Sequence, residues 1–297
     1  MPRFPGILPA VTTPFGPDGG VDAAALTANV AALLDAGVHG LVATGTMGEA
    51  GSLTRDERAA VVASVVDAAA GRAPVVAGVS AGTPGDAAAF ARDAAAAGAT
   101  ALMLLPPLGY RGDAREVIAH YAAVAGAADL PLMAYNNPEA SGTDMSPALV
   151  VRLAAEVDAV VAVKECSGDA RRLAAILNAA PGLEVLVGGD DWALEGLCAG
   201  ATGWVSGVAV CAPAECVALY DACTGGDLAR ARAVYARLLP LGRLDMTPKL
   251  VQFFKAAQDA LGFAGGPVRP PRLALDVADR EVLRAALDAL GAAVPAA

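Results

Sequence analysis

Eight short apolar segments recur along this chain of 297 residues, and longer stretches with a helical pattern separate them. The segments are apolar at nearly every position, which is typical of parallel strands buried on both faces. Parallel strands need a crossover between them, so the alternation predicts successive β–α units. We predict strands at residues 7–11, 40–43, 75–78, 101–105, 131–135, 160–164, 184–187 and 203–206, and helices near 22–36, 54–70, 84–97, 113–127, 146–156, 169–179 and 191–199.

Repeated β–α units of this number and size predict an α/β fold, a (β/α)8 TIM barrel. The remaining patterns predict further helices near 212–223, 227–239, 247–261 and 278–291. We therefore expect residues 1–210 to form a catalytic barrel and residues 211–297 to form a C-terminal helical extension packed on it. Side chains that accept hydrogen bonds from a first helical turn are expected at Asp22, Thr54 with Glu57, Thr83, Ser146 and Asp169.

Charge and cysteine usage exclude several classes of function. The net charge is -10 and basic residues are not clustered, which disfavours nucleic acid and acidic membranes as partners. The five cysteines form no CxxC pair, and only two histidines occur, so neither a metal centre nor a Ser/His/Asp triad is expected. The start lacks a signal pattern and no long apolar stretch follows, so we expect a cytoplasmic protein. No metal and no cofactor are expected.

Lys164 closes the sixth predicted strand and is one of only three lysines in the chain. Burial at a strand end predicts a lowered pKa, which leaves a neutral amine able to attack a carbonyl carbon. The alternative is a lysine that extends from the strand end into solvent. Because active sites of TIM barrels lie at the C-terminal ends of the strands, the position favours a catalytic role.

The second and fifth predicted strands end in two further candidate groups. Gly45 and Gly48 flank a turn whose backbone amides, with the Thr46 hydroxyl, would suit a carboxylate, although an ordinary glycine-rich turn has the same pattern. Tyr135 ends the fifth predicted strand, where its hydroxyl would transfer protons during catalysis. The alternative is an amphipathic tyrosine at the rim of the barrel without a catalytic role. Acidic residues near the strand ends, and one thiol, are expected in structural roles: Glu49, Asp190 and Asp191 in turns and caps, and Cys166 in packing.

Five segments resemble the dihydrodipicolinate synthase / N-acetylneuraminate lyase family. They are residues 6–15, Gly45-Thr46-Met47-Gly48-Glu49 with Leu53-Thr54, Tyr135-Asn136-x-Pro138, Val163-Lys164-Glu165-x-Ser167-Gly168, and Gly189-Asp190-Asp191. The resemblance implies a metal-free lyase, usually a homo-oligomer (a tetramer or a dimer), that acts on a small 2-keto acid or cyclic imino acid. It implies Lys164 as the Schiff-base lysine, Tyr135 as the proton-transfer residue, and Thr46 with the amide of Met47 as the carboxylate site. Further pocket residues are expected at Gly45, Leu108, Tyr110, Ala140, Gly189 and Val205.

Three positions depart from the synthase pattern. Met47 stands where synthases have a second threonine, and Leu108 stands where they have a tyrosine, which Tyr110 would replace after a loop shift. Ala140 stands where they have an arginine for the second substrate's carboxylate. These departures disfavour lysine biosynthesis, and the lost polar relay also disfavours sialic acid cleavage.

Other segments resemble the 1-pyrroline-4-hydroxy-2-carboxylate deaminases. They are Tyr135-Asn136-Asn137-Pro138 and residues 163–169, 244–252 and 267–273. We therefore expect a deaminating dehydration of 1-pyrroline-4-hydroxy-2-carboxylate to 2,5-dioxopentanoate. The alternatives are a 4-hydroxy-tetrahydrodipicolinate synthase-like enzyme or a pyruvate-releasing aldolase of sugar acids or aromatic 2-keto acids. A non-catalytic keto-acid-binding protein is the alternative from another class.

Overall fold

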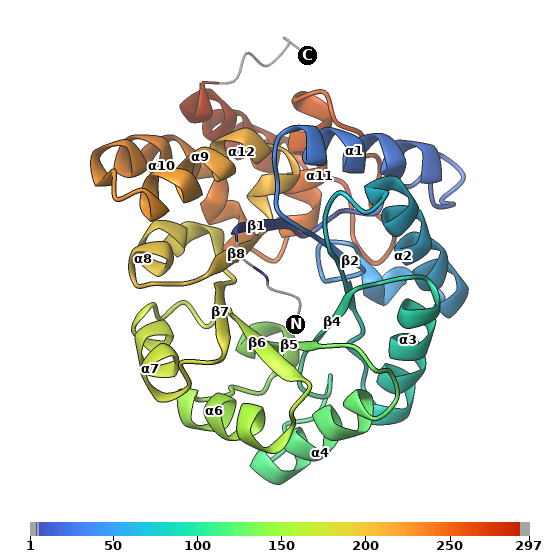
Figure 1. Cartoon of the computed structure of the whole chain (residues 1–297). Helices are drawn as coiled ribbons and strands as arrows, with labels where there is room; N and C mark the ends of the chain where they lie inside the picture. Colours follow the sequence, from blue (N-terminus) through green and yellow to red (C-terminus); the bar gives the residue numbers. More distant parts are fainter. Residues whose placement is uncertain (1–3, 5, 292–297) are drawn as a thin grey trace.

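Parallel strands form one closed sheet in the computed structural model, which describes residue 4 and residues 6–291 (Figure 1). The strands pair in the order β1-β8-β7-β6-β5-β4-β3-β2, and Ala10 bridges to Val42 between the two ends of the sheet. The (β/α)8 fold is confirmed, and every strand lies within two residues of its predicted bounds. The strands are β1 (Gly6–Pro9), β2 (Leu41–Ala43), β3 (Val75–Gly78), β4 (Ala101–Leu104), β5 (Leu132–Asn136), β6 (Val160–Glu165), β7 (Glu184–Val187) and β8 (Gly203–Ser206).

A ring of helices covers the outside of this sheet. The caps predicted at Asp22, Thr54, Thr83 and Ser146 are confirmed, because each side chain accepts a backbone N–H of the helix that follows. Asp169 is confirmed in part: the cap position is Ala170, one residue later, but the Asp169 side chain accepts the N–H of Arg171, the first residue of the helix, at 3.1 Å. The helices are α1 (Ala23–Asp35), α2 (Arg55–Ala69), α3 (Pro84–Ala96), α4 (Ala114–Ala125), α6 (Pro147–Glu156), α7 (Arg171–Ala179), α8 (Ala193–Cys198) and α9 (Pro213–Thr224).

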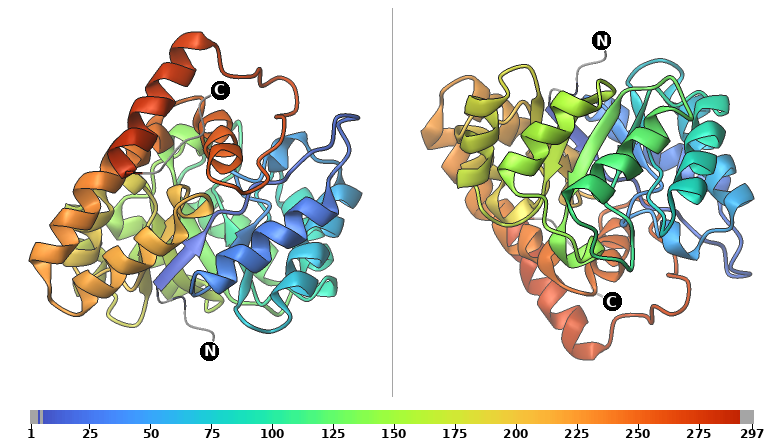
Figure 2. Two further views of the ribbon diagram at one scale, coloured as in Figure 1. Left: turned by 90° about the horizontal axis from the view of Figure 1, so that it is seen from above. Right: turned by 90° about the horizontal axis from the view of Figure 1, so that it is seen from below.

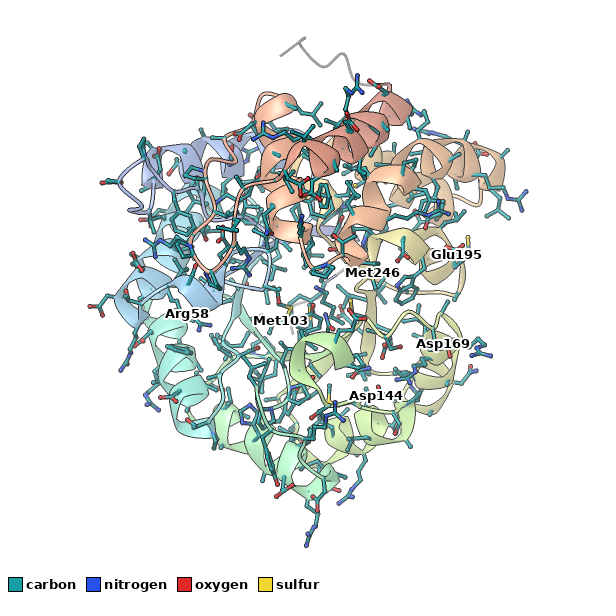
Figure 3. All side chains as sticks on the ribbon, turned by 180° about the vertical axis from the view of Figure 1, so that it is seen from behind. Arg58, Met103, Asp144, Asp169, Glu195 and Met246 are labelled. Atoms are coloured by element: carbon teal, nitrogen blue, oxygen red, sulfur yellow. The ribbon has the colours of Figure 1, made fainter. Side chains whose placement is uncertain are left out.

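Burial of the strands on both faces explains their unbroken apolar pattern. Among strand residues only Val161 and Glu184 are partly exposed, because the helices cover the outer face and side chains fill the interior. Figure 3 shows the same division of side chains, with Met103 near the middle of the barrel and Asp169 and Glu195 at its periphery. The interior is therefore a packed core, and a ligand site of the barrel is expected at one end of its strands.

The C-terminal helices pack together along one side of the barrel (Figure 2). They are α10 (Leu228–Gly242), η4 (Arg243–Met246), α11 (Leu250–Ala260) and α12 (Val277–Leu290). Helix α9 contacts β1 and α8, so we propose that it completes the barrel and that the extension begins after it; the division at residue 210 stays a prediction. The expected homo-oligomer also stays a prediction. None of the helices within the described residues has the length and apolar character needed to span a membrane.

A buried ion pair joins the extension to the turn after β2. Lys255 Nζ on α11 lies 3.0 Å from Glu49 Oε1, and both side chains are almost fully buried. The same ammonium donates to the Thr13 and Pro267 carbonyls at 2.9 and 2.6 Å, so all three of its protons have acceptors. Glu49 is therefore more than the turn residue that we predicted: its carboxylate fixes the end of the turn to the extension.

Candidate active site

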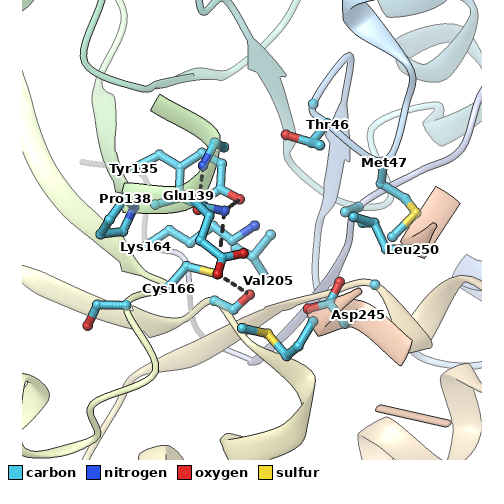
Figure 4. Close-up of a pocket in the computed structure, with 18 of the residues that line it drawn as sticks. Thr46, Met47, Tyr135, Pro138, Glu139, Lys164, Cys166, Val205, Asp245 and Leu250 are labelled. Carbon is cyan, nitrogen blue, oxygen red and sulfur yellow. Dashed lines mark hydrogen bonds between the residues drawn. The ribbon is translucent and has the colours of Figure 1, made fainter. Parts of the chain in front are cut away.

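A cavity of about 380 Å³ opens at the C-terminal ends of the strands (Figure 4). Its wall combines the turn after β2, the ends of β5, β6 and β8, and the segment 245–250 of the extension. Among the described residues that line it, Lys164 is the only one with a cationic side chain, and Glu139 and Asp245 are the only ones with carboxylates. The cavity thus has one fixed positive charge, at the position where the sequence predicts a nucleophile.

The register of β5 and β6 places Tyr135 beside Lys164. These two residues are direct partners in the parallel ladder, and Asn136 pairs with Glu165 one position further on. Successive side chains of a strand point to opposite faces, so Asn136 and Glu165 turn away from the cavity. There Asn136 Nδ2 donates to Glu165 Oε2 at 2.9 Å, and both residues are fully buried. This bond locks the register that brings the lysine and the tyrosine together.

Lys164 Nζ lies over the ring of Tyr135, 4.1 Å from its centroid, and the lysine is only 6% exposed. Burial lowers the pKa of this amine, but Tyr135, Cys166 and Asp245 raise it, and the net pKa lies above the ordinary value of lysine. The lowered pKa expected from the sequence is therefore wrong. The amine carries a proton that must be transferred before it can attack a carbonyl carbon.

Two neighbours of Lys164 keep their own protons at neutral pH. Burial raises the pKa of the Tyr135 hydroxyl, despite the lysine beside it, and Asn137 Nδ2 donates to this hydroxyl at 3.0 Å. Burial also raises the pKa of the Cys166 thiol to about 12, and its Sγ donates to the Gly188 carbonyl at 3.2 Å. Cys166 lines the cavity as a protonated thiol, so it is not a nucleophile there.

The turn after β2 presents free donors to the cavity. Thr44 and Glu49 adopt left-handed backbone angles, with φ of 52° and 53°, and bracket residues 45–48. Such strained positions persist where the surroundings fix them, often at binding sites. Neither the Thr46 hydroxyl nor the Met47 amide has a hydrogen-bond partner among the described residues, while both residues line the cavity. Both groups can thus donate to an anion.

Asp190 holds the loops after β7 and β8 together. Its Oδ1 accepts from Trp204 Nε1, Ser206 Oγ and the Gly207 amide at 2.9–3.2 Å, and its Oδ2 accepts from the Val208 amide at 2.6 Å. The helix cap predicted for Asp190 and Asp191 is wrong, because α8 follows Trp192 and has no side-chain cap. Four donors on one buried carboxylate instead fix the strand-eight side of the cavity.

The structure brings together most of the predicted site residues. Lys164, Tyr135, Thr46, Met47, Gly45, Ala140 and Val205 all line the cavity. Leu108, Tyr110 and Gly189 do not: Leu108 packs against the core, and Gly188 takes the place expected for Gly189. Tyr110 is 55% exposed and its hydroxyl donates to Glu116, so it does not replace the missing relay tyrosine within this chain.

Sequence reasoning missed a group of lining residues from two segments. Asn137 and Glu139 come from the short helix α5 (Pro138–Ser141) and its cap, and Asp245, Met246 and Leu250 come from the extension. For α5 the signal was present, because Asn-Pro is a usual start of a helical turn. For Asp245 the resemblance of residues 244–252 to the deaminases was a signal, but it did not place the residue in the cavity, since only the packing of α10 and α11 brings η4 to the barrel mouth.

The arrangement can perform carbonyl chemistry. It offers an amine, a phenol beside it, and free donors on a neighbouring strand end. Within the described part of the chain, no three histidine, cysteine, aspartate or glutamate residues gather where they would bind a metal ion. The barrel and this set of side chains define a TIM-barrel enzyme of the class I lyase type.

Comparison with known proteins identifies the family. The chain belongs to the dihydrodipicolinate synthetase family, whose sequence model matches residues 3–290. It is 39% identical to the 4-hydroxy-tetrahydrodipicolinate synthase of Methanothrix thermoacetophila over 90% of each chain. The crystal structure of dihydrodipicolinate synthase from Aquifex aeolicus superposes with a TM-score of 0.93 at 28% identity and covers 99% of this chain and 100% of its own.

A second solved structure of the family holds a ligand. YagE of Escherichia coli K12, determined in complex with pyruvate, superposes with a TM-score of 0.91 at 29% identity and covers 97% of this chain and 99% of its own. The family expected from the sequence is therefore confirmed, whereas the likeness to the deaminases stays a prediction.

Proposed function

We propose that this protein is a lyase in which Lys164 forms a Schiff base with a small 2-keto acid of the pyruvate type. The observation that carries the proposal is the position of Lys164: it is buried, it is the only cationic side chain among the described lining residues, and Tyr135 is beside it. A keto acid offers an anion for the free donors and an electrophilic carbon for the amine. The pyruvate held by the related YagE protein supports this class of substrate.

The proposed reaction begins with binding of the carboxylate by the Thr46 hydroxyl and the Met47 amide. After losing a proton, Lys164 Nζ attacks the adjacent carbonyl carbon, and the carbonyl oxygen takes a proton from Tyr135 as the carbinolamine forms. The carbinolamine nitrogen then gives a proton to the Tyr135 phenolate, and Tyr135 passes a proton to the hydroxyl. This oxygen leaves as water, and the resulting protonated Schiff base withdraws electrons from the next carbon. Tyr135 suits this role because its raised pKa keeps the proton on the phenol until it is needed.

The comparisons support a carbon–carbon bond reaction better than the deamination. The named synthase relative favours condensation or cleavage at the carbon next to the Schiff base. The cavity limits the second substrate, because Ala140 offers no cation and Asp245 would repel a second carboxylate. We therefore propose that the second substrate has no carboxylate of the kind that the synthases bind with an arginine.

The deaminating dehydration of 1-pyrroline-4-hydroxy-2-carboxylate is the second candidate. It needs recognition of one carboxylate only, which agrees with a single cation and a single set of free donors in the cavity. Lys164 would attack the cyclic imine carbon and open the ring. The C4 hydroxyl would then leave, and hydrolysis would release ammonia and 2,5-dioxopentanoate.

Borohydride trapping tests the main proposal. The protein is mixed with pyruvate and sodium borohydride, digested, and the modified peptide is identified by mass spectrometry. We expect a stable adduct on Lys164, and no adduct on Lys249 or Lys255. Absence of any adduct would contradict the Schiff base, and an adduct without any turnover would favour the keto-acid-binding protein.

Product assays separate the candidate reactions. The protein is incubated with 1-pyrroline-4-hydroxy-2-carboxylate and, separately, with pyruvate and a panel of aldehydes, and products are followed by mass spectrometry. A condensation product with an aldehyde would support the main proposal. Formation of 2,5-dioxopentanoate instead would establish the deaminase.

Replacing Tyr135 with phenylalanine should lower kcat by about 10²–10⁴-fold, the usual contribution of a positioned proton-transfer group. The ring stays and still packs under Lys164, so the fold should hold. The Tyr220→Phe variant, changed on α9 away from the cavity, is the matched control and should keep parental kcat. Equal kcat for Tyr135→Phe and the parent would remove Tyr135 from the mechanism.

A further inference from the structure

Asp245 lies in the cavity although it belongs to the extension and not to the barrel. Figure 4 shows Lys164 between Tyr135 on one side and Asp245 on the other. A Cβ placed on Gly207 would lie 3.0 Å from Asp245 Oδ1 and 2.9 Å from Met47 Cε, so Asp245 adjoins both the turn after β2 and the end of β8. Its Oδ2 accepts a hydrogen bond from the Asp190 amide at 3.4 Å, which anchors the carboxylate to the loop after β7.

Asp245 is also the carboxylate of the cavity that is suited to accept a proton. Burial raises its pKa to about 6, against the opposing influence of Lys164 and the Asp190 amide, and Asp191 raises it further. The titratable groups around it are Tyr135 on β5, Lys164 on β6, Cys166 directly after β6, and Asp190 and Asp191 on η2 (Asp190–Trp192). At neutral pH Asp245 is therefore an anion with a basicity that suits proton transfer.

The other candidate bases of the cavity are less suitable. Tyr135 and Cys166 have raised pKa values and hold their protons at neutral pH. Glu139 is exposed at the rim of the cavity. Among the described lining residues, only Asp245 combines a carboxylate, a position beside Gly207 at the end of β8, and closeness to the lysine.

We propose that Asp245 is the general base that removes a proton from the carbon next to the Schiff-base carbon. This role rests on the proposed function. The C–H bond breaks, its proton moves to the Asp245 carboxylate, and its electron pair forms the carbon–carbon double bond of an enamine. The electrons of the C=N bond return to the Lys164 nitrogen, which neutralises the iminium charge. In the reverse direction, Asp245 returns this proton to the enamine carbon.

The test measures proton exchange at the methyl group of pyruvate in D₂O. Exchange is followed by the loss of the methyl proton signal, and Schiff-base formation is measured in parallel by borohydride trapping. We expect Asp245→Asn to trap pyruvate as the parent does, and to exchange its methyl protons at least about 100-fold more slowly. Asp245→Glu should recover part of the exchange. Asp35→Asn, which removes an exposed carboxylate on α1, is the control and should match the parent.

The pH profile gives a second readout that needs no variant. When the pH falls through about 6, Asp245 gains a proton and can no longer accept one, so exchange per trapped adduct should fall in the parent protein. This fall in exchange at low pH should be absent from the residual exchange of Asp245→Asn.

Two results would overturn the proposal directly. One is exchange at the parental rate in a folded Asp245→Asn protein that still traps pyruvate, and the other is a flat pH profile of the parent protein. Loss of trapping in Asp245→Asn would also overturn the proposal, because Asp245 would then act in the formation of the Schiff base. Absence of trapping in the parent would instead count against the proposed function.

Discussion

Lys164→Met should lose turnover by about three orders of magnitude or more, because removal of a covalent nucleophile leaves only binding and orientation. Methionine keeps most of the length of the side chain and its packing against the Tyr135 ring. Lys164→Arg keeps the charge, but a guanidinium stays protonated and cannot form a Schiff base. Both variants should therefore fail to trap pyruvate, and the comparison separates the loss of the nucleophile from the loss of the charge.

Lys249→Met is the matched control for this experiment. Lys249 is another of the three lysines; its side chain is 45% exposed and pairs with Asp279 on α12. It should keep both trapping and turnover. Unfolding curves should show that the Lys164 variants fold, since the replacement by methionine also removes a buried charge that is costly to keep in the interior. Borohydride-stable adducts in a Lys164 variant would show that another amine carries the reaction.

Lys255→Met should lower the free energy of unfolding by about 3–5 kcal/mol, because it leaves the buried Glu49 carboxylate without its ammonium partner. The pair lies 3.0 Å apart with 1% and 0% of the side chains exposed. Urea unfolding followed by circular dichroism measures the change. Because Glu49 ends the turn that carries Thr46 and Met47, the KM for the keto acid should also rise.

A double replacement tests whether the loss of stability in Lys255→Met comes from the buried charge of Glu49. In Lys255→Met/Glu49→Gln the amide keeps an acceptor for the Arg269 N–H and removes the buried charge, which only Arg272 at 3.6 Å would still face, so most of the stability should return. Lys249→Met, which breaks a partly exposed pair, should cost far less than Lys255→Met. If Lys255→Met unfolds like the parent, or if the double variant is no more stable than the single one, the ion pair does not hold the turn in place.

The sequence was sufficient to predict the barrel and to place Lys164 and Tyr135 on neighbouring strand ends. Periodicity is a local property: apolar runs buried on both faces and helical stretches between them predict β–α units without knowledge of any long-range contact. The strand ends then locate Lys164, Tyr135 and the Thr46–Met47 turn on one face, since all parallel strands point the same way. Capping positions such as Thr54 were equally local and were confirmed.

Predictions that depended on the surroundings of a side chain were less successful. Strand-end position alone indicated a lowered pKa for Lys164, but Asp245, Tyr135 and Cys166 surround the amine and raise its pKa. The loop after β4 turns Tyr110 outward, which no local pattern reveals. Asp190 and Glu49 were predicted as turn or cap residues only. Their hydrogen-bond donors come from β8 and from the extension, far away in the sequence, so no local pattern indicates them.

The sequence by itself thus determined the order of strands and helices and the edge of the sheet at which the chemistry lies, because both follow from contacts between near neighbours along the chain. Only the tertiary structure decided which groups share the cavity with Lys164. Asp245 is separated from it by eighty-one positions, the difference between the two residue numbers. It reaches the amine because α10 and α11 pack beside the barrel and carry η4 over its mouth. Protonation depends on charges that are close in space, and closeness in space is fixed by packing.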